Sequence, residues 1–233
     1  MKASFLTRIF DLFSPRHCPV CGHQLSHTQS VLCASCRLHL PVTHFELSPL
    51  DNDMARRFWG LIPIERAAAL FFYEAQSATA TLIYQLKYGH QPQLGEQLGR
   101  MAAIQMEAAH FFDDIDAIVP VPLTRWRRWH RGYNQSMQIA RGVSQVTGLP
   151  IYNKVVQRTT FIQSQTHLNH WQRQANTSEA FRLLHAEPVS GKHLLLIDDI
   201  VTTGSTIIAL ATELQKAGSH MHFSVLSLGY TKS

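Results

Sequence analysis

One segment of the chain reads Leu194-Leu195-Leu196-Ile197-Asp198-Asp199-Ile200-Val201-Thr202-Thr203-Gly204-Ser205-Thr206, and it is the most informative part of the sequence. Its four leading apolar residues predict a strand that is covered on both faces. The residues after it predict a helix, because an apolar stripe recurs at helical spacing at Ile207, Leu210, Ala211 and Leu214. Open α/β sheets bind ligands at the carboxyl ends of their strands, so this strand-to-helix passage is a predicted ligand site.

The residues between the strand and the helix have the chemistry of a sugar-phosphate site. Gly204 allows the backbone to approach a ligand closely, and the amino end of the following helix suits a phosphate. Asp198 and Asp199 are acceptors, which suit the two hydroxyls of a ribose or the water on a magnesium ion. Hydroxyl donors for the phosphate are offered by Thr202, Thr203, Ser205 and Thr206.

This segment resembles the motif with which type I phosphoribosyltransferases bind 5-phosphoribosyl-1-pyrophosphate (PRPP). The resemblance covers the apolar strand, the acidic pair, two further apolar residues and the run Thr-Thr-Gly-Ser-Thr. A capped turn between a strand and a helix is the simpler alternative, but it does not require two adjacent acids at this spacing.

The chain from Ile64 onward alternates between strand-like and helix-like runs. Strands are predicted at residues 67–73, 115–121, 194–197 and 222–228, with a short one at Val155 and Val156; helices are predicted at residues 77–88, around 94–102 and around 139–143. Residues 163–180 are polar and predict a loop or irregular helix over a site. The alternation predicts an α/β, phosphoribosyltransferase-like domain with a mainly parallel sheet over residues 64–233.

All four cysteines lie near the amino terminus, as Cys18-Pro-Val-Cys21 and Cys33-Ala-Ser-Cys36. Two C-x2-C knuckles at this spacing predict a tetrahedral zinc site with a structural role. Two disulfides or a redox pair are the alternatives, and four nearby histidines are alternative ligands: His17, His23, His27 and His39. We therefore expect residues 1–40 to form a zinc-ribbon module that begins with an amphipathic helix at Met1–Phe13, and residues 41–63 to be a linker.

The apolar runs and the net charge of the chain indicate its cellular compartment and the kind of partner it binds. No apolar run approaches the ~20 residues that span a bilayer, and the amino terminus lacks the pattern of a secretory signal, so we expect a cytoplasmic protein. The formal net charge is +5, which four thiolates and one zinc dication would change to +5 − 4 + 2 = +3. A basic balance favours anionic partners such as nucleic acid or phosphorylated ligands.

A basic and aromatic segment, Arg125-Trp126-Arg127-Arg128-Trp129-His130-Arg131, follows Val119-Pro-Val-Pro-Leu123. Arginines neutralise phosphates and tryptophans stack on unpaired bases, so the segment predicts single-stranded DNA as a partner. Because it follows a strand end, its arginines are alternatively placed to face the pyrophosphate of PRPP. A partly buried Trp pair with solvated arginines is the third reading. The candidate contacts to pyrophosphate or DNA are Lys87, Arg125, Arg127, Arg128 and Arg131.

The whole arrangement resembles the ComF family, including its GntX-like members. The resemblance rests on the two cysteine knuckles, Lys87-Tyr88-Gly89, Val119–Leu123, Arg131-Gly-Tyr-Asn-Gln135 and the PRPP motif. Further matches to the family's order of residues are Gln165, Arg173, Asn176, Ala180 and Phe181. The resemblance implies a cytoplasmic protein that acts on incoming single-stranded DNA in natural transformation or DNA utilisation, with PRPP and magnesium as ligands and with competence helicase or recombination proteins as candidate partners.

The resemblance to phosphoribosyltransferases also implies a mechanism. A nucleophile would attack C1 of PRPP as pyrophosphate leaves, and Asp198 and Asp199 would hold the ribose hydroxyls beside the developing cation. No motif names the acceptor. A PRPP-responsive regulator and a DNA-binding adaptor without transferase activity are therefore the alternatives.

Overall fold

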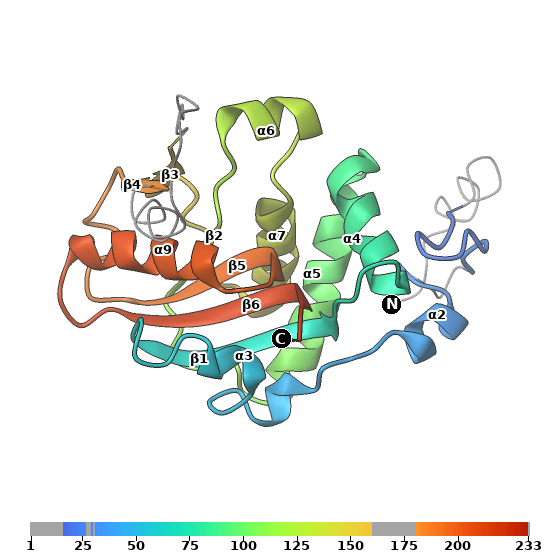
Figure 1. The fold of residues 1–233 in the computed structure, drawn as a ribbon, viewed down its shortest axis with the longest axis horizontal. Helices are drawn as coiled ribbons and strands as arrows, with labels where there is room; N and C mark the ends of the chain where they lie inside the picture. Colours follow the sequence, from blue (N-terminus) through green and yellow to red (C-terminus); the bar gives the residue numbers. More distant parts are fainter. Residues whose placement is uncertain (1–15, 27–28, 30, 160–179, 233) are drawn as a thin grey trace, which may run out of the picture.

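A parallel four-stranded sheet forms the centre of the computed structural model, which describes residues 16–26, 29, 31–159 and 180–232 (Figure 1). Its strands are β1 (Ile64–Phe72), β2 (Ala117–Pro120), β5 (His193–Val201) and β6 (His222–Tyr230), in the order β1-β6-β5-β2. All three pairings are parallel. The prediction of an α/β domain with a mainly parallel sheet is therefore confirmed.

The apolar composition of β5 explains its central position. All four residues from Leu194 to Ile197 are fully buried, since β2 and β6 flank the strand and helices cover it. The strand is longer than its apolar run predicts, because it continues through Asp198 and Asp199 to Val201. The reason is pairing with β6, in which Ile200 lies opposite Gly229 and Val201 opposite Tyr230. The acidic pair thus belongs to the strand itself.

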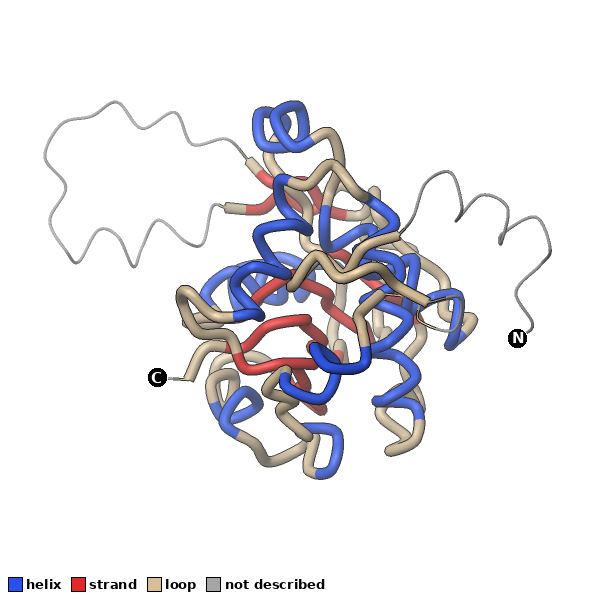
Figure 2. Tube along the Cα trace, turned by 90° about the vertical axis from the view of Figure 1, so that its right-hand side faces the viewer, coloured by secondary structure: helices blue, strands red, loops and turns tan. Residues whose placement is uncertain are grey.

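Helices cover both faces of the sheet, as Figure 2 shows from the side. Helices α4 (Ala78–Tyr88), α5 (Pro92–Glu107) and α7 (Gln135–Thr147) lie on one face, and α9 (Ser205–Leu214) lies on the other (Figure 1). The chain therefore leaves β2 toward one face and β5 toward the opposite face. This reversal between two adjacent strands is the topological switch point at which open α/β sheets bind ligands.

Helices α5 and α7 approach each other closely through glycines. A Cβ atom at Gly99 would collide with the carbonyl of Ile139, and one at Gly142 would collide with the carbonyl of Glu96. The close approach lets α7 pack on β2 and β5 at the same time. Helix α7 ends at Gly148, which adopts a left-handed conformation with φ of 73°.

The segment between the cysteines and the sheet is folded against the domain. Residues 41–63, which we predicted to be a linker, contain η1 (Phe45–Leu47) and α3 (Asp53–Arg56). Met54 and Phe58 are fully buried. These elements are about one turn each, which explains why the sequence shows no periodicity there. The division of the chain into domains at residues 40 and 63 stays a prediction.

Several smaller elements lie beyond the sheet. Strands β3 (Val156–Arg158) and β4 (Phe181–Leu183) pair antiparallel, and helix α6 (Arg125–Arg131) protrudes at the top of Figures 1 and 2. Short helices also form at α2 (Ala34–His39) and η2 (Gln215–Ala217).

Several predicted features lie outside the described residues, namely the helix at Met1–Phe13, His27, the family matches Gln165, Arg173 and Asn176, and all but the last residue of the polar loop at 163–180. Within the part of the chain that the structure does describe, no helix combines the length and the apolar character that crossing a bilayer requires.

Candidate functional site

The candidate site lies at the switch point, where the carboxyl ends of β2 and β5 meet. Strand β2 ends at Pro120, while β5 continues to Val201, so the end of β5 extends beyond its neighbour. Asn134 and Ser136 at the start of α7 also reach this point, because the Nδ2 atom of Asn134 donates to the carbonyl of Val121 at 3.0 Å. Side chains of α7 and α4 contact the acidic residues of β5 here, and we call this place, together with the loop before α9, the crevice.

The loop from Thr202 to Gly204 leads into α9 with a close turn. Gly204 has φ of 80° and precedes the first helical residue, Ser205. A Cβ atom at Gly204 would lie 2.9 Å from Cε1 of Phe58, so both the backbone conformation and the space require glycine. The buried ring of Phe58 therefore supports the loop, and the predicted linker contributes directly to the site.

The hydroxyl groups of the loop line a small pocket at the start of α9. The Thr203 hydroxyl donates to Ser205 Oγ at 3.1 Å, and the Ser205 amide donates to Thr203 Oγ1 at 3.4 Å. The lining of this pocket includes Asp198 and every residue from Ile200 to Ile207. Backbone N–H groups and hydroxyls that converge at the amino end of a helix form an anion site.

Asp198 is the most perturbed titratable group in the crevice. Its Oδ1 atom accepts hydrogen bonds from the Ser136 hydroxyl at 3.1 Å and from the Asp199 amide at 2.9 Å. Although part of the residue is accessible, protein atoms crowd the carboxyl group. The loss of hydration, together with the charge of Asp199, raises the pKa of Asp198 to about 7, against the opposing effect of Ser136 and Lys87.

Asp199 pairs with a residue from a distant part of the chain. The Nζ atom of Lys87, near the end of α4, lies 3.3 Å from Oδ2 of Asp199. The two side chains are only 21% and 12% exposed, so solvent screens this pair less than a surface ion pair. From the sequence we expected Lys87 to contact a phosphate, and the structure brings it to the acidic pair at the mouth of the same crevice.

Three residues of the segment Arg131-Gly-Tyr-Asn-Gln135-Ser136 have a role that we did not predict from the sequence. Asn134 caps α7, since its Oδ1 atom accepts from the Ser136 amide at 3.1 Å. Ser136 then donates to Asp198, and the Tyr133 hydroxyl donates to the Leu86 carbonyl of α4 at 2.6 Å. The segment thus connects α4, β2 and β5. The sequence feature that could have indicated this role is the position of the segment, soon after the end of a predicted strand.

Helix α6 presents the predicted basic and aromatic residues to solvent. Trp126 is 65% exposed and Trp129 is 82% exposed, so the reading of a partly buried Trp pair is wrong. The reason is that α6 protrudes from the domain and has no buried residue. The Trp126 ring stacks on His130 with ring centroids 5.5 Å apart, and Arg131 lies over the Tyr88 ring. Arg125, Arg127 and Arg128 lie on this same helix.

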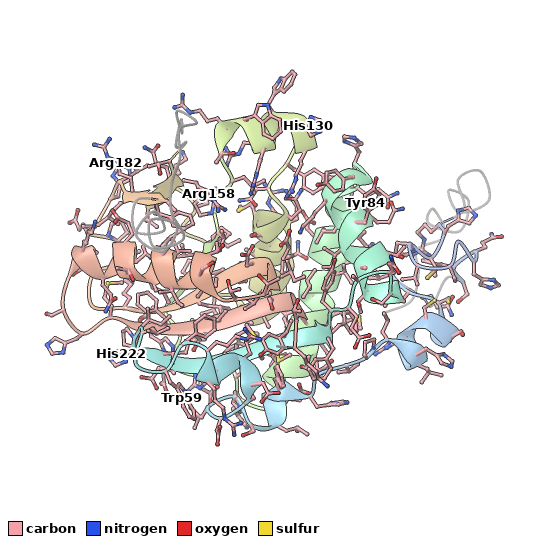
Figure 3. The ribbon with its side chains drawn as sticks, viewed as in Figure 1. Trp59, Tyr84, His130, Arg158, Arg182 and His222 are labelled. Carbon is pink, nitrogen blue, oxygen red and sulfur yellow. The ribbon has the colours of Figure 1, made fainter. Side chains whose placement is uncertain are left out.

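Arg158 on β3 is a further cation at the crevice that we did not single out from the sequence. Burial lowers its pKa, as does the nearby charge of Arg127, while Asp198 acts in the opposite direction. Its guanidinium also lies over the Phe181 ring of β4, at 5.3 Å from the centroid. Figure 3 shows Arg158 on β3 and His130 on α6 along one end of the molecule. Basic groups from two elements therefore accompany the acidic pair.

The four cysteines converge in the amino-terminal segment. Their Sγ atoms, from Cys18, Cys21, Cys33 and Cys36, all lie within 4.8 Å of one another, and all four are free thiols. Ligands of a tetrahedral zinc ion with Zn–S bonds of about 2.3 Å are separated by about 3.8 Å, so this donor set fits a metal ion. The disulfide alternative is not realised, and none of His17, His23 and His39 belongs to the cluster.

Local backbone structure brings the thiols together. Gly22 adopts φ of 72° after the first knuckle, and its amide donates to the Cys18 carbonyl at 2.8 Å. In the second knuckle the Cys36 amide donates to Cys33 Sγ at 3.4 Å at the start of α2. Burial acts to raise the pKa of Cys18, but hydrogen bonds from the backbone at Cys33, Cys21 and Val20 lower it to about 7. Such bonds favour a thiolate at Cys18, whereas burial and hydrogen bonds from the other cysteines raise the pKa of Cys36.

Curated proteins with similar sequences are named for DNA utilization or for competence. The DNA utilization protein YhgH of Escherichia coli (strain K12) is 31% identical over 205 residues, which are 87% of this chain and 85% of that protein. YhgH of Salmonella typhimurium is 30% identical with the same coverage. Competence protein F of Haemophilus influenzae is 31% identical over 141 residues, 59% of this chain and 62% of that protein.

Solved structures similar to this chain include phosphoribosyltransferases. The glutamine PRPP amidotransferase of B. subtilis, complexed with ADP and GMP, aligns with a TM-score of 0.41 and 19% identity. The alignment covers 61% of this chain but 30% of the amidotransferase, so this chain spans less than a third of that enzyme. A hypoxanthine phosphoribosyltransferase of Trypanosoma cruzi aligns with a TM-score of 0.37 and 12% identity, over 60% and 66% of the two chains. None of the family models searched matches the chain.

Proposed function

Because the chain belongs to the ComF family, together with competence protein F and the DNA utilization protein YhgH, we propose that it binds PRPP and acts in the use of incoming DNA. The proposed ligand site is the crevice at the carboxyl ends of β2 and β5. One observation carries the proposal, namely the small hydroxyl-lined pocket at the start of α9 directly beside the acidic pair of β5.

Each part of PRPP has a counterpart in the crevice. The 5-phosphate would bind the hydroxyls and amides of Thr202–Thr206, where the start of α9 favours an anion. Asp198 and Asp199 would accept hydrogen bonds from the ribose hydroxyls. Lys87 and Arg158 would supply positive charge for the pyrophosphate. Carboxylate oxygens are ligands that Mg²⁺ prefers, so the acidic pair also fits a magnesium ion that accompanies PRPP.

Pentosyl transfer is the reaction that this arrangement would support. The C1–O bond to pyrophosphate breaks, a nucleophile of the acceptor forms the new bond to C1, and pyrophosphate leaves with the bonding electrons. Binding of the 5-phosphate, remote from C1, would orient the reacting carbon. The carboxylates would place negative charge near the cation that develops there. The acceptor would be a nucleophile that enters the crevice and reaches C1.

Calorimetry with PRPP and magnesium tests the ligand, using the variant Asp198→Asn/Asp199→Asn. Loss of both carboxylates is expected to weaken PRPP binding by about 100-fold or more, since hydrogen bonds to charged groups are worth about 1.5–3 kcal/mol each. Asp51→Asn/Asp53→Asn, at an exposed pair of acids near α3, is the matched control and should bind as the wild type does. Unchanged affinity in the crevice variant would remove the acidic pair from the ribose role.

A second function, binding of single-stranded DNA by α6, is favoured by the exposure of Trp126 and Trp129. Unpaired bases stack on exposed aromatic rings, and the arginines of the same helix suit the backbone phosphates. Salt-sensitive binding of oligo(dT) that survives Asp198→Asn/Asp199→Asn would show that DNA handling does not depend on the acidic pair. Release of pyrophosphate from PRPP with a panel of bases would instead establish a transferase. If neither activity occurs, capture of a competence helicase or recombination protein that depends on PRPP would indicate a regulator.

The four-cysteine cluster is proposed to bind one zinc ion with a structural role. Four thiolates leave no open position for a reaction, and a segment this short buries too little apolar surface to fold alone. Mass spectrometry of metals should find one zinc per chain in the wild type and none in Cys21→Ser/Cys36→Ser. A four-thiolate zinc site fits the cytoplasmic location that the sequence predicts.

A further inference from the structure

A second pocket lies beside the crevice and is unrelated to the phosphate loop. It occupies about 400 Å³ along α4, and its lining includes Tyr73, Tyr84, Lys87 and Tyr88. This volume falls within the range of about 300–1,000 Å³ that is typical of pockets for small ligands. The lining is more apolar than that of the phosphate pocket, so its occupant differs in chemistry from a phosphate.

Two tyrosine rings form the wall of this pocket. Tyr84 and Tyr88 are one helical turn apart on α4, with ring centroids 4.9 Å apart and an interplanar angle of 45°. They are 61% and 44% exposed, although α4 has a fully buried face elsewhere at Leu82 and Leu86. Figure 3 shows Tyr84 on α4 at the outer side of that helix. Large exposed rings at the edge of an apolar pocket are suited to stacking with a planar partner.

The charges around the pocket favour a partner that carries phosphate. The Arg131 guanidinium of α6 lies 5.4 Å from the centroid of the Tyr88 ring. Lys87 lines the pocket and also lies 3.3 Å from Asp199, so the pocket and the crevice share one wall. The hydrogen bond from Tyr133 to the Leu86 carbonyl holds this end of α4 in place. A ligand with a planar ring and attached phosphate groups therefore fits the two tyrosine rings and the nearby cations.

We propose that this pocket binds an unpaired nucleobase, with Tyr84 and Tyr88 as its stacking surface. This proposal rests on the proposed function in one respect. If the crevice binds PRPP, a base held in this pocket lies next to the PRPP site, because Lys87 contacts Asp199. Stacking of a base on aromatic side chains is tolerant of sequence, because every base has a planar face. The base is either free or part of a single strand that also contacts α6.

Fluorescence of 2-aminopurine separates these sources and tests the site. The probes are 2-aminopurine riboside and an oligo(dT) that contains one 2-aminopurine, since stacking quenches the probe. Tyr84→Ala/Tyr88→Ala is expected to weaken binding of the oligonucleotide by about 5- to 150-fold, the range for loss of stacking on one base. Tyr84→Phe/Tyr88→Phe keeps both rings and should bind within about twofold of the wild type. If only the oligonucleotide binds, the source is a single strand; if the riboside binds equally well, it is a free base or nucleoside.

Two further variants serve as a second test and as a control: one fills the pocket, and the other removes an aromatic ring far from it. Thr81→Phe introduces a ring from another part of the lining and should also weaken binding, without removal of either tyrosine. Trp59→Ala removes a 49% exposed ring from a different region of the surface and should have no effect. Unchanged binding of both probes in Tyr84→Ala/Tyr88→Ala and in Thr81→Phe overturns the proposal. So does an equal loss in Trp59→Ala.

Calorimetry with PRPP on the same variants keeps the two proposals distinct. Wild-type protein that quenches 2-aminopurine but binds no PRPP would contradict the proposed PRPP function and support the base pocket. Wild-type protein that binds PRPP but quenches neither probe would contradict the base pocket and support the PRPP function. Tyrosine variants that retain wild-type PRPP affinity and lose the probe are the expected result, because no phosphate ligand is removed.

Discussion

The crevice at the ends of β2 and β5 and the helix α6 both carry groups that suit phosphorylated ligands, yet they are built differently. In the crevice, Asp198 is held by Ser136 and Asp199 by Lys87. On α6, Trp126 and Trp129 project into solvent. Groups fixed by internal partners suit one small ligand of defined shape. Exposed rings and arginines suit a flexible polyanion, whose contacts tolerate change.

A pair of glycine substitutions gives the largest expected contrast between the two regions. Gly204→Ala should lower the free energy of unfolding by about 2–5 kcal/mol, because a left-handed residue other than glycine costs about 1–2 kcal/mol and overpacking against Phe58 adds about 1–3 kcal/mol. The displaced loop should also lose PRPP binding in calorimetry. Gly132→Ala, after α6, has φ of 77° but open space around it, so only about 1–2 kcal/mol should be lost and PRPP should bind normally. Equal losses of stability and of PRPP binding in the two variants would contradict the expected difference between the crevice and α6.

Removal of charge from α6 should affect DNA more than PRPP. We expect Arg125→Gln/Arg127→Gln/Arg128→Gln to weaken oligo(dT) binding by about tenfold and to reduce the slope of log K against log salt by about 2, since each phosphate contact to a single strand contributes about 0.7. Fluorescence anisotropy over a salt series measures both quantities. A variant that instead loses PRPP and keeps DNA would place these arginines at the pyrophosphate and erase the distinction.

The raised pKa of Asp198 predicts a pH dependence that belongs to the crevice alone. The folded state holds this proton more tightly than the unfolded chain, so the stabilisation is complete at acidic pH and is lost as the pH rises from about 4 through about 7. Because the residue is partly accessible, we expect a loss of about 1–2 kcal/mol across this range. Urea denaturation at about pH 4.5 to 8, compared with Asp198→Asn, measures it. Parallel curves for the two proteins would show that Asp198 titrates normally.

The smallest effect should come from Ser136, which positions Asp198 rather than contacts a ligand. Ser136→Ala removes one hydrogen bond worth about 0.5–1.5 kcal/mol and should raise the pKa of Asp198 further. We expect a few-fold loss of PRPP affinity and a shift of the pH transition to higher values. Ser144→Ala is the matched control, since its hydroxyl donates at 2.7 Å to the Leu149 carbonyl at the far end of the same helix. A similar loss of PRPP affinity in both variants would assign Ser136 a purely structural role.

The amino-acid sequence was sufficient to predict the four strands of the sheet and the helices α4, α5, α7 and α9. A continuous apolar run, two acids and a glycine among hydroxyl residues are adjacent in the chain, so their consequence can be read without a fold. The same holds for the cysteines, whose C-x2-C spacing brings each pair together within one turn. The lengths of the strands were less predictable, because β5 is extended by its pairing with β6.

Contacts between distant segments came from the fold alone. Phe58 meets Gly204, Lys87 meets Asp199, and Tyr133 meets Leu86, although nothing in the local sequence around any of these residues pairs them. The perturbed pKa of Asp198 and the tyrosine pocket on α4 follow from such contacts. Short-range patterns encode which elements form, whereas burial and charge at a site depend on which elements the packed sheet and helices bring side by side.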